Sequence, residues 1–453
     1  MTPAAVVEGT EGPVVEPRTD AGVLFRLLTP RGPAGAVRTV IVPGLQLRLV
    51  SKQAAQLAAG ELLVTRTRFP RTARRILERQ GLRALVYGVA PSVTDARVIS
   101  VLPPSFVPNP RPLRKLLSFL STRAQARELG TPSDTAVLAM RGGSPGQWLA
   151  DLAGLGSANP PSVSLRLSWR GAAGGATALV RVDDKERFVK IAFDDARGER
   201  LRREHAVLTT LAVSASGHGV IVPKVISLQE LDGMILLTED AIDGRVAAGV
   251  PAAQIEEVFE RIAAWLATWH RATLVVGDSS RGGERNVVEL AQALDVDRRY
   301  VLWLEAALTA MPRSAPPSVA VHGDLTMWNL LVARGPGTVA VIDWEDASLN
   351  GVPLSDLFYA AVDAELSRGS YNTRLLAFDA VFPDSLTRIG RICRTAGESL
   401  GLDADLVRLC FHETWLRHAA REAIGSDGRR EFQELVHRRL AVEPERFPWR
   451  TDA

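Results

Sequence analysis

The sequence has little cysteine, no long apolar run and no strong excess of charge of either sign. Only two of its 453 residues are cysteines, Cys393 and Cys410, and their spacing indicates neither a disulfide framework nor a metal site. No stretch reaches the roughly 18 apolar residues that a membrane helix needs. The N-terminus lacks the basic and apolar regions of a secretory signal. We therefore expect a cytoplasmic protein without a membrane contact.

Positive and negative charges are nearly balanced along the chain. It carries 54 Lys and Arg against 51 Asp and Glu, which gives a net charge of +3 at pH 7. The basic residues are dispersed, whereas nucleic-acid binding normally shows a concentrated basic stripe, so no nucleic-acid partner is predicted. Apolar residues make up 46% of the chain, which is enough for a large core, and the length indicates more than one domain. The oligomeric state stays open.

Composition changes along the chain indicate how it is divided into domains. Residues 1–21 are rich in Gly, Pro, Glu and Thr, which predicts disorder. Residues 22–145 read as a small α/β domain of unknown role, and the Gly- and Pro-containing stretch 146–162 as a linker. Residues 163–241 are rich in strand patterns, and 242–445 are mostly helical. This order favours an α+β protein with two lobes, preceded by the small domain.

The small domain mixes strand and helix patterns. Strands are predicted at VRTVIV, 84–90 and 134–143, and helices at 71–81, which ends at Gly81, and at 110–130. The stretch from Ile76 to Pro104 resembles the last part of a class I methyltransferase domain. No glycine-rich strand-to-helix turn precedes it to hold a methyl donor. A structural module is therefore favoured over a second activity.

Two motifs in the helical part carry the most chemical information. They are VHGDLTMWNLLV at 321–332 and VAVIDWEDASLNGVPLSDL at 339–357. Transfer of a nucleotide's terminal phosphoryl group needs a base for the acceptor hydroxyl and oxygen ligands for Mg²⁺. Asp324, Asn329 and Asp343 offer such oxygens. The apolar runs after Asn329 and before Asp343 predict a hairpin that returns Asp343 to Asn329.

Taken together, these two motifs resemble the signature of the aminoglycoside phosphotransferase and choline kinase superfamily, which has a protein-kinase-like fold. The resemblance covers roughly residues 165–430. It implies that Asp324 is the catalytic base and that Asn329 and Asp343 ligate Mg²⁺. His322 matches the histidine that braces the catalytic loop, and Asp356 matches an acidic residue that holds this loop by hydrogen bonds.

The strand-rich part is expected to bind the nucleotide. Lys190 lies in an apolar strand, and alternation places its side chain on the face opposite to those of Val189 and Ile191. A lysine among apolar strand residues is costly to bury without a partner of opposite charge. Glu204 on the next helix is its expected partner, with Glu199 as the alternative. The resemblance implies that this Lys–Glu pair serves the α- and β-phosphates.

Further nucleotide contacts are expected at a glycine-rich loop and at a hinge. The loop 170–178 contains Gly174 and Gly175, which allow a close approach of the backbone to phosphates. The hinge, from Thr238 to Ala241 and including Glu239, would bind the adenine edge through backbone groups. ATP is the expected nucleotide, and GTP remains open.

The acceptor is predicted only as the hydroxyl of a small molecule. Asp363 and Glu413 are candidates to bind an amine of the acceptor, or are ordinary solvated charges. An amino sugar, an aminoglycoside, an amino alcohol and a sugar all remain open. Trp328 and Trp344 are interpreted as packing residues. The alternative to an active kinase is a non-catalytic, pseudokinase-like nucleotide-binding module scaffolded by the N-terminal domain.

Overall fold

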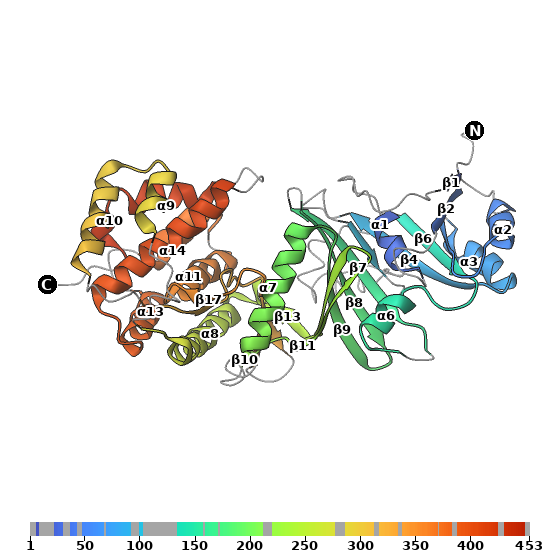
Figure 1. Cartoon of the computed structure of the whole chain (residues 1–453), viewed down its shortest axis with the longest axis horizontal. Coiled ribbons are helices and arrows are strands. Elements are labelled where there is room, and N and C mark those ends of the chain that lie inside the picture. Colours follow the sequence, from blue (N-terminus) through green and yellow to red (C-terminus); the bar gives the residue numbers. More distant parts are fainter. Residues whose placement is uncertain are drawn as a thin grey trace. The chain divides into compact units, whose positions relative to one another are not determined.

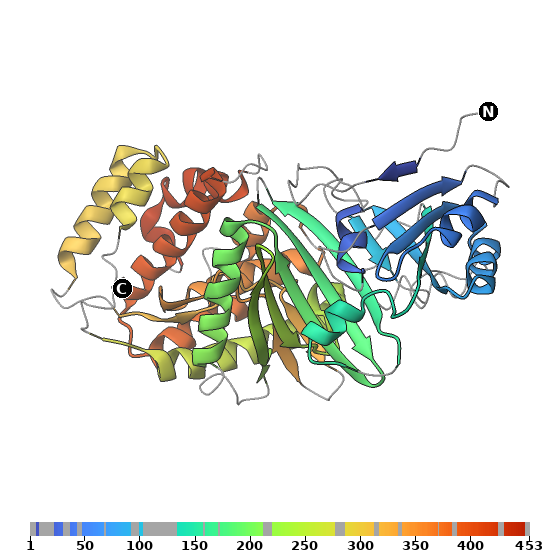
Figure 2. The same ribbon diagram turned by 45° about the vertical axis from the view of Figure 1, so that its right-hand side comes forward.

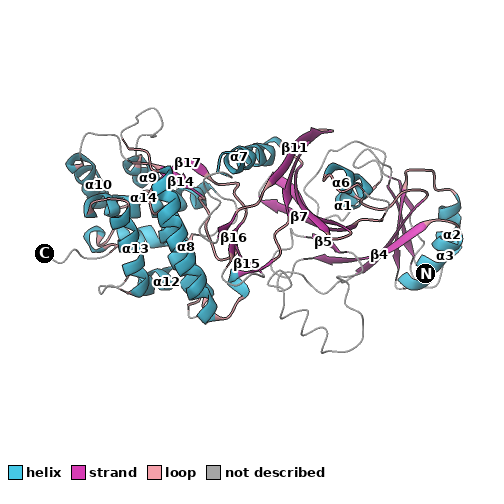
Figure 3. Ribbon diagram, turned by 90° about the horizontal axis from the view of Figure 1, so that it is seen from below, coloured by secondary structure: helices cyan, strands magenta, loops and turns pink. Residues whose placement is uncertain are grey.

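The computed structural model divides the chain into two compact units. Unit 1 comprises residues 1–205 and 224–241, and unit 2 comprises 206–223 and 242–453. Figure 3 shows that strands dominate unit 1 and helices dominate unit 2. The α+β class is confirmed. The structure describes residues 6–8, 22–29, 37–42, 48–67, 69–91, 99–102, 134–156, 159–170, 173–211, 220–276, 286–311, 317–333, 338–369, 371–382, 387–424 and 430–448.

Unit 1 is built on one continuous sheet. Its strands follow the order β1-β2-β3-β6-β4-β5-β7-β8-β9-β12-β11, and all neighbouring pairs are antiparallel except β2 and β3. The strands are β1 (Val6–Glu8), β2 (Val37–Val42), β3 (Leu62–Thr67), β4 (Arg83–Pro91), β5 (Ile99–Leu102), β6 (Asp134–Met140), β7 (Ser162–Arg170), β8 (Ala173–Val182), β9 (Lys185–Ala192), β11 (Val225–Leu231) and β12 (Met234–Asp240).

Helices cover both faces of this sheet (Figure 1). They are α1 (Gly22–Leu27), α2 (Arg48–Ala55), α3 (Pro70–Arg79), α6 (Gln147–Leu152) and α7 (Asp195–Leu211). Alternation along β3 explains the two-sided burial, because successive strand residues point to opposite faces. Leu62 and Val64 join the core that contains α1 and α6, whereas Leu63 joins the core with α2 and α3. In Figure 2, α7 runs along the strands β9 and β12, where Leu201 packs on Ile235 and Leu237.

The elements predicted for the small domain are largely confirmed. VRTVIV is β2, 84–90 lies in β4, 134–140 is β6, and α3 covers most of 71–81. Gly81 has a φ of 72°, as its predicted role at the helix end requires. Val6–Glu8 pair with β2, although the sequence predicts disorder for 1–21. The predicted helix 110–130 lies outside the described residues.

The stretch predicted as a linker contributes to the core. Residues 146–162 contain α6, with Leu149 and Ala150 fully buried. The strands on either side of it belong to the same sheet, because β5 of the small domain pairs with β7 through Val101↔Leu165. Gly and Pro residues made this stretch resemble a linker, but its apolar residues pack on the sheet. The predicted domain boundaries stay predictions.

Unit 2 combines helices with short strands. The strands form one sheet in the order β10-β16-β15-β13 and a pair β14-β17. The strands are β10 (Val220–Ile221), β13 (Gly244–Val246), β14 (Val319–Val321), β15 (Leu330–Ala333), β16 (Val339–Val341) and β17 (Ser348–Gly351). The helices are α8 (Ala252–Thr273), α9 (Val287–Ala293), α10 (Arg298–Ala310), α11 (Ser355–Ser367), α12 (Arg374–Val381), α13 (Arg388–Ser399), α14 (Ala404–Ile424) and α15 (Glu431–Leu435). Short helical turns are η2 (Ala247–Gly249), η3 (Val436–Leu440, a π-helix) and η4 (Pro444–Arg446).

Aromatic residues form the centre of unit 2. Trp265 and Trp269 lie one turn apart on α8, stack at 4.8 Å between ring centroids, and both meet Trp344 edge-on. This places α8 directly against the segment that follows β16. A second aromatic cluster includes Phe358, Phe378 and Phe411, from α11, α12 and α14. Ring packing thus fixes the four helices α8, α11, α12 and α14 and the segment after β16, which belongs to the second predicted motif.

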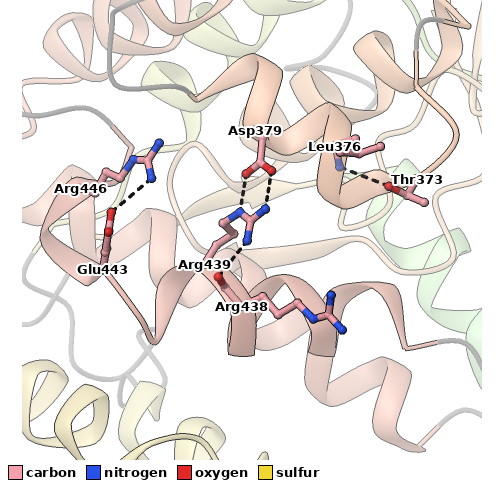
Figure 4. A network of polar contacts seen from close by, with 7 residues as sticks. All are labelled: Thr373, Leu376, Asp379, Arg438, Arg439, Glu443 and Arg446. Atoms are coloured by element: carbon pink, nitrogen blue, oxygen red, sulfur yellow. Dashed lines mark hydrogen bonds and ion pairs between the residues drawn. The ribbon is translucent and has the colours of Figure 1, made fainter.

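The C-terminal segment is joined to α12 by a charged pair. Arg439 donates from Nε and Nη2 to the two carboxylate oxygens of Asp379, at 2.6 and 2.7 Å (Figure 4). Bidentate geometry of this kind is the stronger form of ion pair. Within the part of the chain that the structure describes, no helix has the length and apolar character needed to cross a membrane.

Candidate active site

The predicted catalytic loop connects β14 to β15 and is held by its own polar groups. The Asn329 amide Nδ2 donates to the carbonyl oxygen of Asp324 at 2.8 Å and to its Oδ2 at 3.2 Å. The backbone of Thr326 donates to the Asp324 carbonyl, and the backbone of Asn329 donates to Thr326. Asp324 and Asn329 are therefore brought together, although five residues separate them in sequence.

Gly323 gives this loop its starting direction. Its φ is 81°, and a Cβ placed on it would lie 2.3 Å from the carbonyl oxygen of Asp346. Both the left-handed backbone and the close approach require glycine. Arg421 of α14 donates to the Gly323 carbonyl at 3.0 Å. The loop therefore begins in a conformation that no other residue would adopt without strain.

His322 connects the two motifs. Its Nε2 lies 2.9 Å from the carbonyl oxygen of Ile342, and its Nδ1 accepts a bond from the backbone N–H of Asp324 at 3.3 Å. This pattern assigns the ring proton to Nε2. The ring is fully buried and meets Trp344 edge-on at 4.8 Å. The histidine thus has a bracing position in the structure, and its role stays a prediction.

Asp356, in the first turn of α11, accepts two backbone bonds from the catalytic loop. His322 N–H lies 2.6 Å from Oδ2 and Gly323 N–H lies 2.9 Å from Oδ1. Burial is the main influence on the carboxyl and raises its pKa, while His322 and these bonds lower it. The side chain is in a position to hold the loop, as the sequence resemblance implies.

The hairpin predicted to return Asp343 toward Asn329 is present. β15 and β16 are antiparallel with Leu330 opposite Val341, and the backbone N–H of Ile342 donates to the carbonyl of Asn329 at 2.9 Å. Asp343 follows with a φ of 67°. A non-glycine residue in this region carries strain of about 1–3 kcal/mol, which is characteristic of functional sites.

The donor set at this hairpin fits Mg²⁺. Asn329 uses its amide nitrogen within the loop, so its amide oxygen and the Asp343 carboxylate would be the protein ligands of a cation. Mg²⁺ commonly takes one or two protein oxygens and completes its octahedron with phosphates and water. Among the described residues, no cluster of three or more His, Cys, Asp or Glu side chains is arranged to hold a metal without such help.

The two residues predicted to bind an amine are engaged with protein groups. Asp363 is buried, accepts a bond from the Met327 N–H at 2.7 Å and lies 3.5 Å from Arg374. Burial raises the pKa of Asp363 and Arg374 lowers it. Glu413 is 1% exposed and accepts two bonds from Arg417. Both side chains are buried, so their interpretation as ordinary solvated charges is wrong. Acidic side chains are rarely buried without partners such as these.

In unit 1, Lys190 and Glu204 form a buried ion pair. Nζ lies 2.6 Å from Oε1, and the two side chains are 5% and 0% exposed. Val189 and Ile191 point into the opposite core, as the alternation along β9 predicts. Glu199 pairs with Arg202 instead, so it is not the partner of Lys190. The use of this pair for phosphates stays a prediction.

Most of the segment predicted as a glycine-rich loop belongs to a strand. Gly174 and Gly175 lie within β8, paired with Trp169 and Ser168 of β7. The backbone N–H of Gly174 donates to Asp194, which also accepts a bond from the Arg197 N–H at the start of α7. The prediction of a loop over 170–178 is therefore wrong for residues 173–178, because backbone pairing continues through the glycines.

The predicted hinge, Thr238 to Ala241, overlaps the last residues of β12. Glu239 is buried and lies opposite Phe188 of β9, and Asp240 pairs with Arg187 at 2.6 Å. Ala241 is partly buried and is the last residue of unit 1. The contribution of Glu239 and Ala241 to nucleotide binding stays a prediction.

The two tryptophans of the motifs have different environments. Trp344 is fully buried and donates from Nε1 to the carbonyl of Val341, so its packing role is confirmed. Trp328 is 46% exposed, so the same interpretation is wrong for it. Aromatic character alone does not distinguish a core residue such as Trp344 from an exposed one such as Trp328.

The bonded loop and hairpin are the arrangement that the two motifs predict for a kinase-like phosphotransferase. Residues 168–384 match the model of a family described as "Phosphotransferase enzyme family", and the resemblance read from the two motifs is confirmed. No curated protein matches the sequence.

Several solved structures are similar to this chain. A thermostable mutant of aminoglycoside phosphotransferase APH(4)-Ia has 15% identity and a TM-score of 0.42, and the match covers 66% of this chain and 97% of that one. The phosphotransferase APH(3'')-Id from Streptomyces rimosus has 18% identity and a TM-score of 0.37, over 55% and 91% of the chains. An aminoglycoside-3'-phosphotransferase of type VIII has 19% identity and a TM-score of 0.35, over 54% and 90%.

Proposed function

We propose that this protein is an ATP-dependent small-molecule kinase, which moves the γ-phosphoryl group of ATP to a hydroxyl group of its acceptor. The observation that carries the proposal is the arrangement of Asp324, Asn329 and Asp343. The Asn329 amide bonds Asp324, and the β15–β16 hairpin, with a backbone bond from Ile342 to Asn329, returns the chain at Asp343 to Asn329. The family match over residues 168–384 supports the same class of reaction.

Each residue has a defined task in this proposal. Asp324 accepts the proton of the acceptor hydroxyl as its oxygen bonds to phosphorus. Asn329 and Asp343 hold Mg²⁺, which when bound neutralises charge on the β- and γ-phosphates. Lys190, oriented by Glu204, contacts the α- and β-phosphates. The bond between the γ-phosphorus and its bridging oxygen breaks, and ADP leaves.

The acceptor class is proposed only as far as its hydroxyl group. An amino sugar, an aminoglycoside, an amino alcohol and a sugar remain the candidates. The internal bonds of Asp363 and Glu413 reduce the support for a cationic acceptor that binds there. The cytoplasm, which supplies ATP, remains the proposed location, and the two buried cysteines, which form no disulfide, are compatible with it.

A nucleotide-consumption screen tests the proposal. The purified protein would be incubated with Mg²⁺, ATP or GTP, and a panel of hydroxylated acceptors. We expect acceptor-dependent ADP formation that is lost in Asp324→Ala. The control Asp405→Ala removes an exposed carboxylate on α14 and should retain activity. Nucleotide binding without turnover for every acceptor would instead favour the pseudokinase-like alternative.

Nucleotide binding can be tested separately from turnover. Lys190→Met should weaken ATP binding in calorimetry with Mg²⁺ present. Lys185→Met is the matched control, because Lys185 is exposed at the start of the same strand. Equal affinities of the two variants would contradict the proposed phosphate contact of Lys190.

A further inference from the structure

Positive charge is concentrated in the first part of the chain, although the whole chain is nearly balanced. Residues 22–145 contain 19 Lys and Arg and five Asp and Glu, whereas the remaining residues contain 35 and 46. A charge asymmetry of this kind is typical of proteins that bind a polyanion. The whole-chain balance predicts no nucleic-acid partner, whereas this local distribution favours one for residues 22–145.

The helices α2 and α3 cover the same face of the sheet in unit 1. The strands β2 and β3 are parallel, and each leads into a helix on that face, where Val50 and Leu77 share one core. The two helices therefore run in the same direction, and the Gln80 side chain donates to the Ser51 hydroxyl between them. Figures 1 and 3 show them side by side. Their N-terminal ends, which carry the positive pole of the helix dipole, thus lie at the same edge of the sheet.

The exposed side chains of these two helices are mostly basic. Those that we call the basic face are Arg48 and Lys52 on α2 and Arg71, Arg75 and Arg79 on α3. Within the described part of the chain, no carboxylate pairs with any of these five. The two helices contain one acidic residue, Glu78, which pairs with Arg74 at 2.6 Å. The basic face therefore keeps its positive charge exposed to solvent.

The arrangement of the basic face opposes the stability of its own helices. Arg71, Arg75 and Arg79 follow one another at i, i+4 spacing, where like charges repel. Arg48 and Arg71 lie in the first turns of their helices, where the helix dipole disfavours a positive charge and no acidic residue is present. A surface that serves only solubility mixes both signs of charge. The pattern is therefore typical of a surface whose ligand brings negative charges that offset the repulsion.

The spacing of the basic face matches two lines of phosphate groups. Residues four apart in a helix are about 6 Å apart along its axis, which is close to the separation of successive phosphates in a nucleic-acid strand. Packed helices lie about 8–10 Å apart, and the major groove of B-DNA is about 12 Å wide. The α2 row and the α3 row can therefore each follow one edge of a groove. Guanidinium groups bind phosphate oxygens in bidentate geometry, and four of the five side chains are arginines.

A membrane surface fits the basic face less well. Helices that lie in a membrane interface insert an apolar side among the lipids. The apolar side of α3, with Ala73 and Leu77, is instead fully buried against the sheet. All exposed side chains from Arg71 to Arg79 are polar. This face therefore offers charge to a partner and no apolar anchor.

We propose that the basic face of α2 and α3 binds the phosphate backbone of double-stranded DNA. Its five side chains neutralise phosphates and release the counterions that surround the duplex. Contacts to phosphates carry no sequence information, so the binding is independent of the base sequence. The five residues precede residues 168–384, which match the phosphotransferase family, so the proposal does not depend on the kinase function.

Fluorescence anisotropy of the full chain with a short labelled DNA duplex tests the proposal. We expect the affinity of the wild-type protein to fall by about 10²- to 10³-fold between 50 and 200 mM salt, as about five phosphate contacts require. In the triple variant Arg71→Ala, Arg75→Ala, Arg79→Ala, the slope of log affinity against log salt should decrease in magnitude by about three. Alanine favours the helix, so this variant should keep the wild-type melting temperature.

The matched control removes the same charge from exposed positions in unit 2. It is the triple variant Arg298→Ala, Arg299→Ala, Arg394→Ala, and it should bind the duplex as the wild-type protein does. Equal weakening in both variants would show an effect of net charge alone and would overturn the proposal. It would also be overturned if the wild-type protein bound no duplex at 50 mM salt, or bound phosphatidylserine vesicles and no duplex.

Discussion

The ammonium group of Lys190 lies 2.6 Å from Oε1 of Glu204, with both side chains removed from solvent. Loss of one partner of a buried ion pair leaves the other charge uncompensated, which typically costs about 3–5 kcal/mol. We expect Glu204→Ala to lower the free energy of unfolding by this amount, as measured by denaturant titration. Glu199→Ala, at an exposed pair with Arg202, should change it far less, because solvent screens an exposed ion pair. Similar losses for both would contradict the assignment.

Gly323 should tolerate no side chain. In Gly323→Ala the new Cβ would lie 2.3 Å from the Asp346 carbonyl, so the catalytic loop must shift. We expect loss of most phosphoryl transfer, together with a lower melting temperature. Gly369→Ala is the matched control, because Gly369 has a similar φ of 77° and no atom near its Cβ position. It should cost only the conformational strain, about 1 kcal/mol, and retain activity.

His412 should make stability depend on pH. Its Nδ1 accepts from the Tyr300 hydroxyl and its Nε2 donates to the Pro444 carbonyl, so the ring is neutral, and burial lowers its pKa to about 3. The unfolded chain takes up a proton near pH 6.5 that the folded chain does not. The contribution of His412 to the free energy of unfolding is therefore fully present above pH 6.5 and declines as the pH falls toward 3.

The His412 contribution can be measured by unfolding in denaturant at pH 7.5 and 5.5. It amounts to about 1.4 kcal/mol of lost stability over this interval. In His412→Asn the pH dependence should decrease by that amount. His437→Asn, at an exposed histidine, should leave it unchanged. A variant with the wild-type pH dependence would show that His412 titrates normally in the folded protein.

Trp328 should influence acceptor binding more than stability. It is 46% exposed and directly precedes Asn329. We expect Trp328→Ala to raise the acceptor KM severalfold and to leave the melting temperature nearly unchanged. Leu302→Ala, at another exposed apolar residue, should alter neither quantity. A large fall in melting temperature for Trp328→Ala would restore the interpretation of this residue as part of the core.

Local patterns were sufficient to predict several parts of the site. The hairpin that returns Asp343 to Asn329 follows from two apolar runs separated by a turn, and the facing of Lys190 follows from strand alternation. Both depend on residues that are close in sequence. The family match confirms the resemblance on which the roles of these residues were predicted.

Contacts between distant segments were not predictable in the same way. The resemblance implies that Asp356 holds the catalytic loop, but nothing in the sequence indicates that Asp363, two turns further along α11, accepts a bond from the Met327 N–H, because the i, i+7 spacing also describes ordinary packing. Likewise, the pairing of β5 with β7 depends on tertiary arrangement and not on local composition. At Gly174 and Gly175 local composition was misleading, because glycines that are typical of a loop lie within a paired strand.

The pairing of β5 with β7 also determines where the protein can be shortened. Removal of everything before residue 160 would strip β7 of a partner along Leu165–Leu167 and expose its N–H and C=O groups. Unprotected edges of this kind recruit strands from other molecules. A shortened chain that kept residues 168–384, which match the family model, should therefore self-associate more strongly than the full chain.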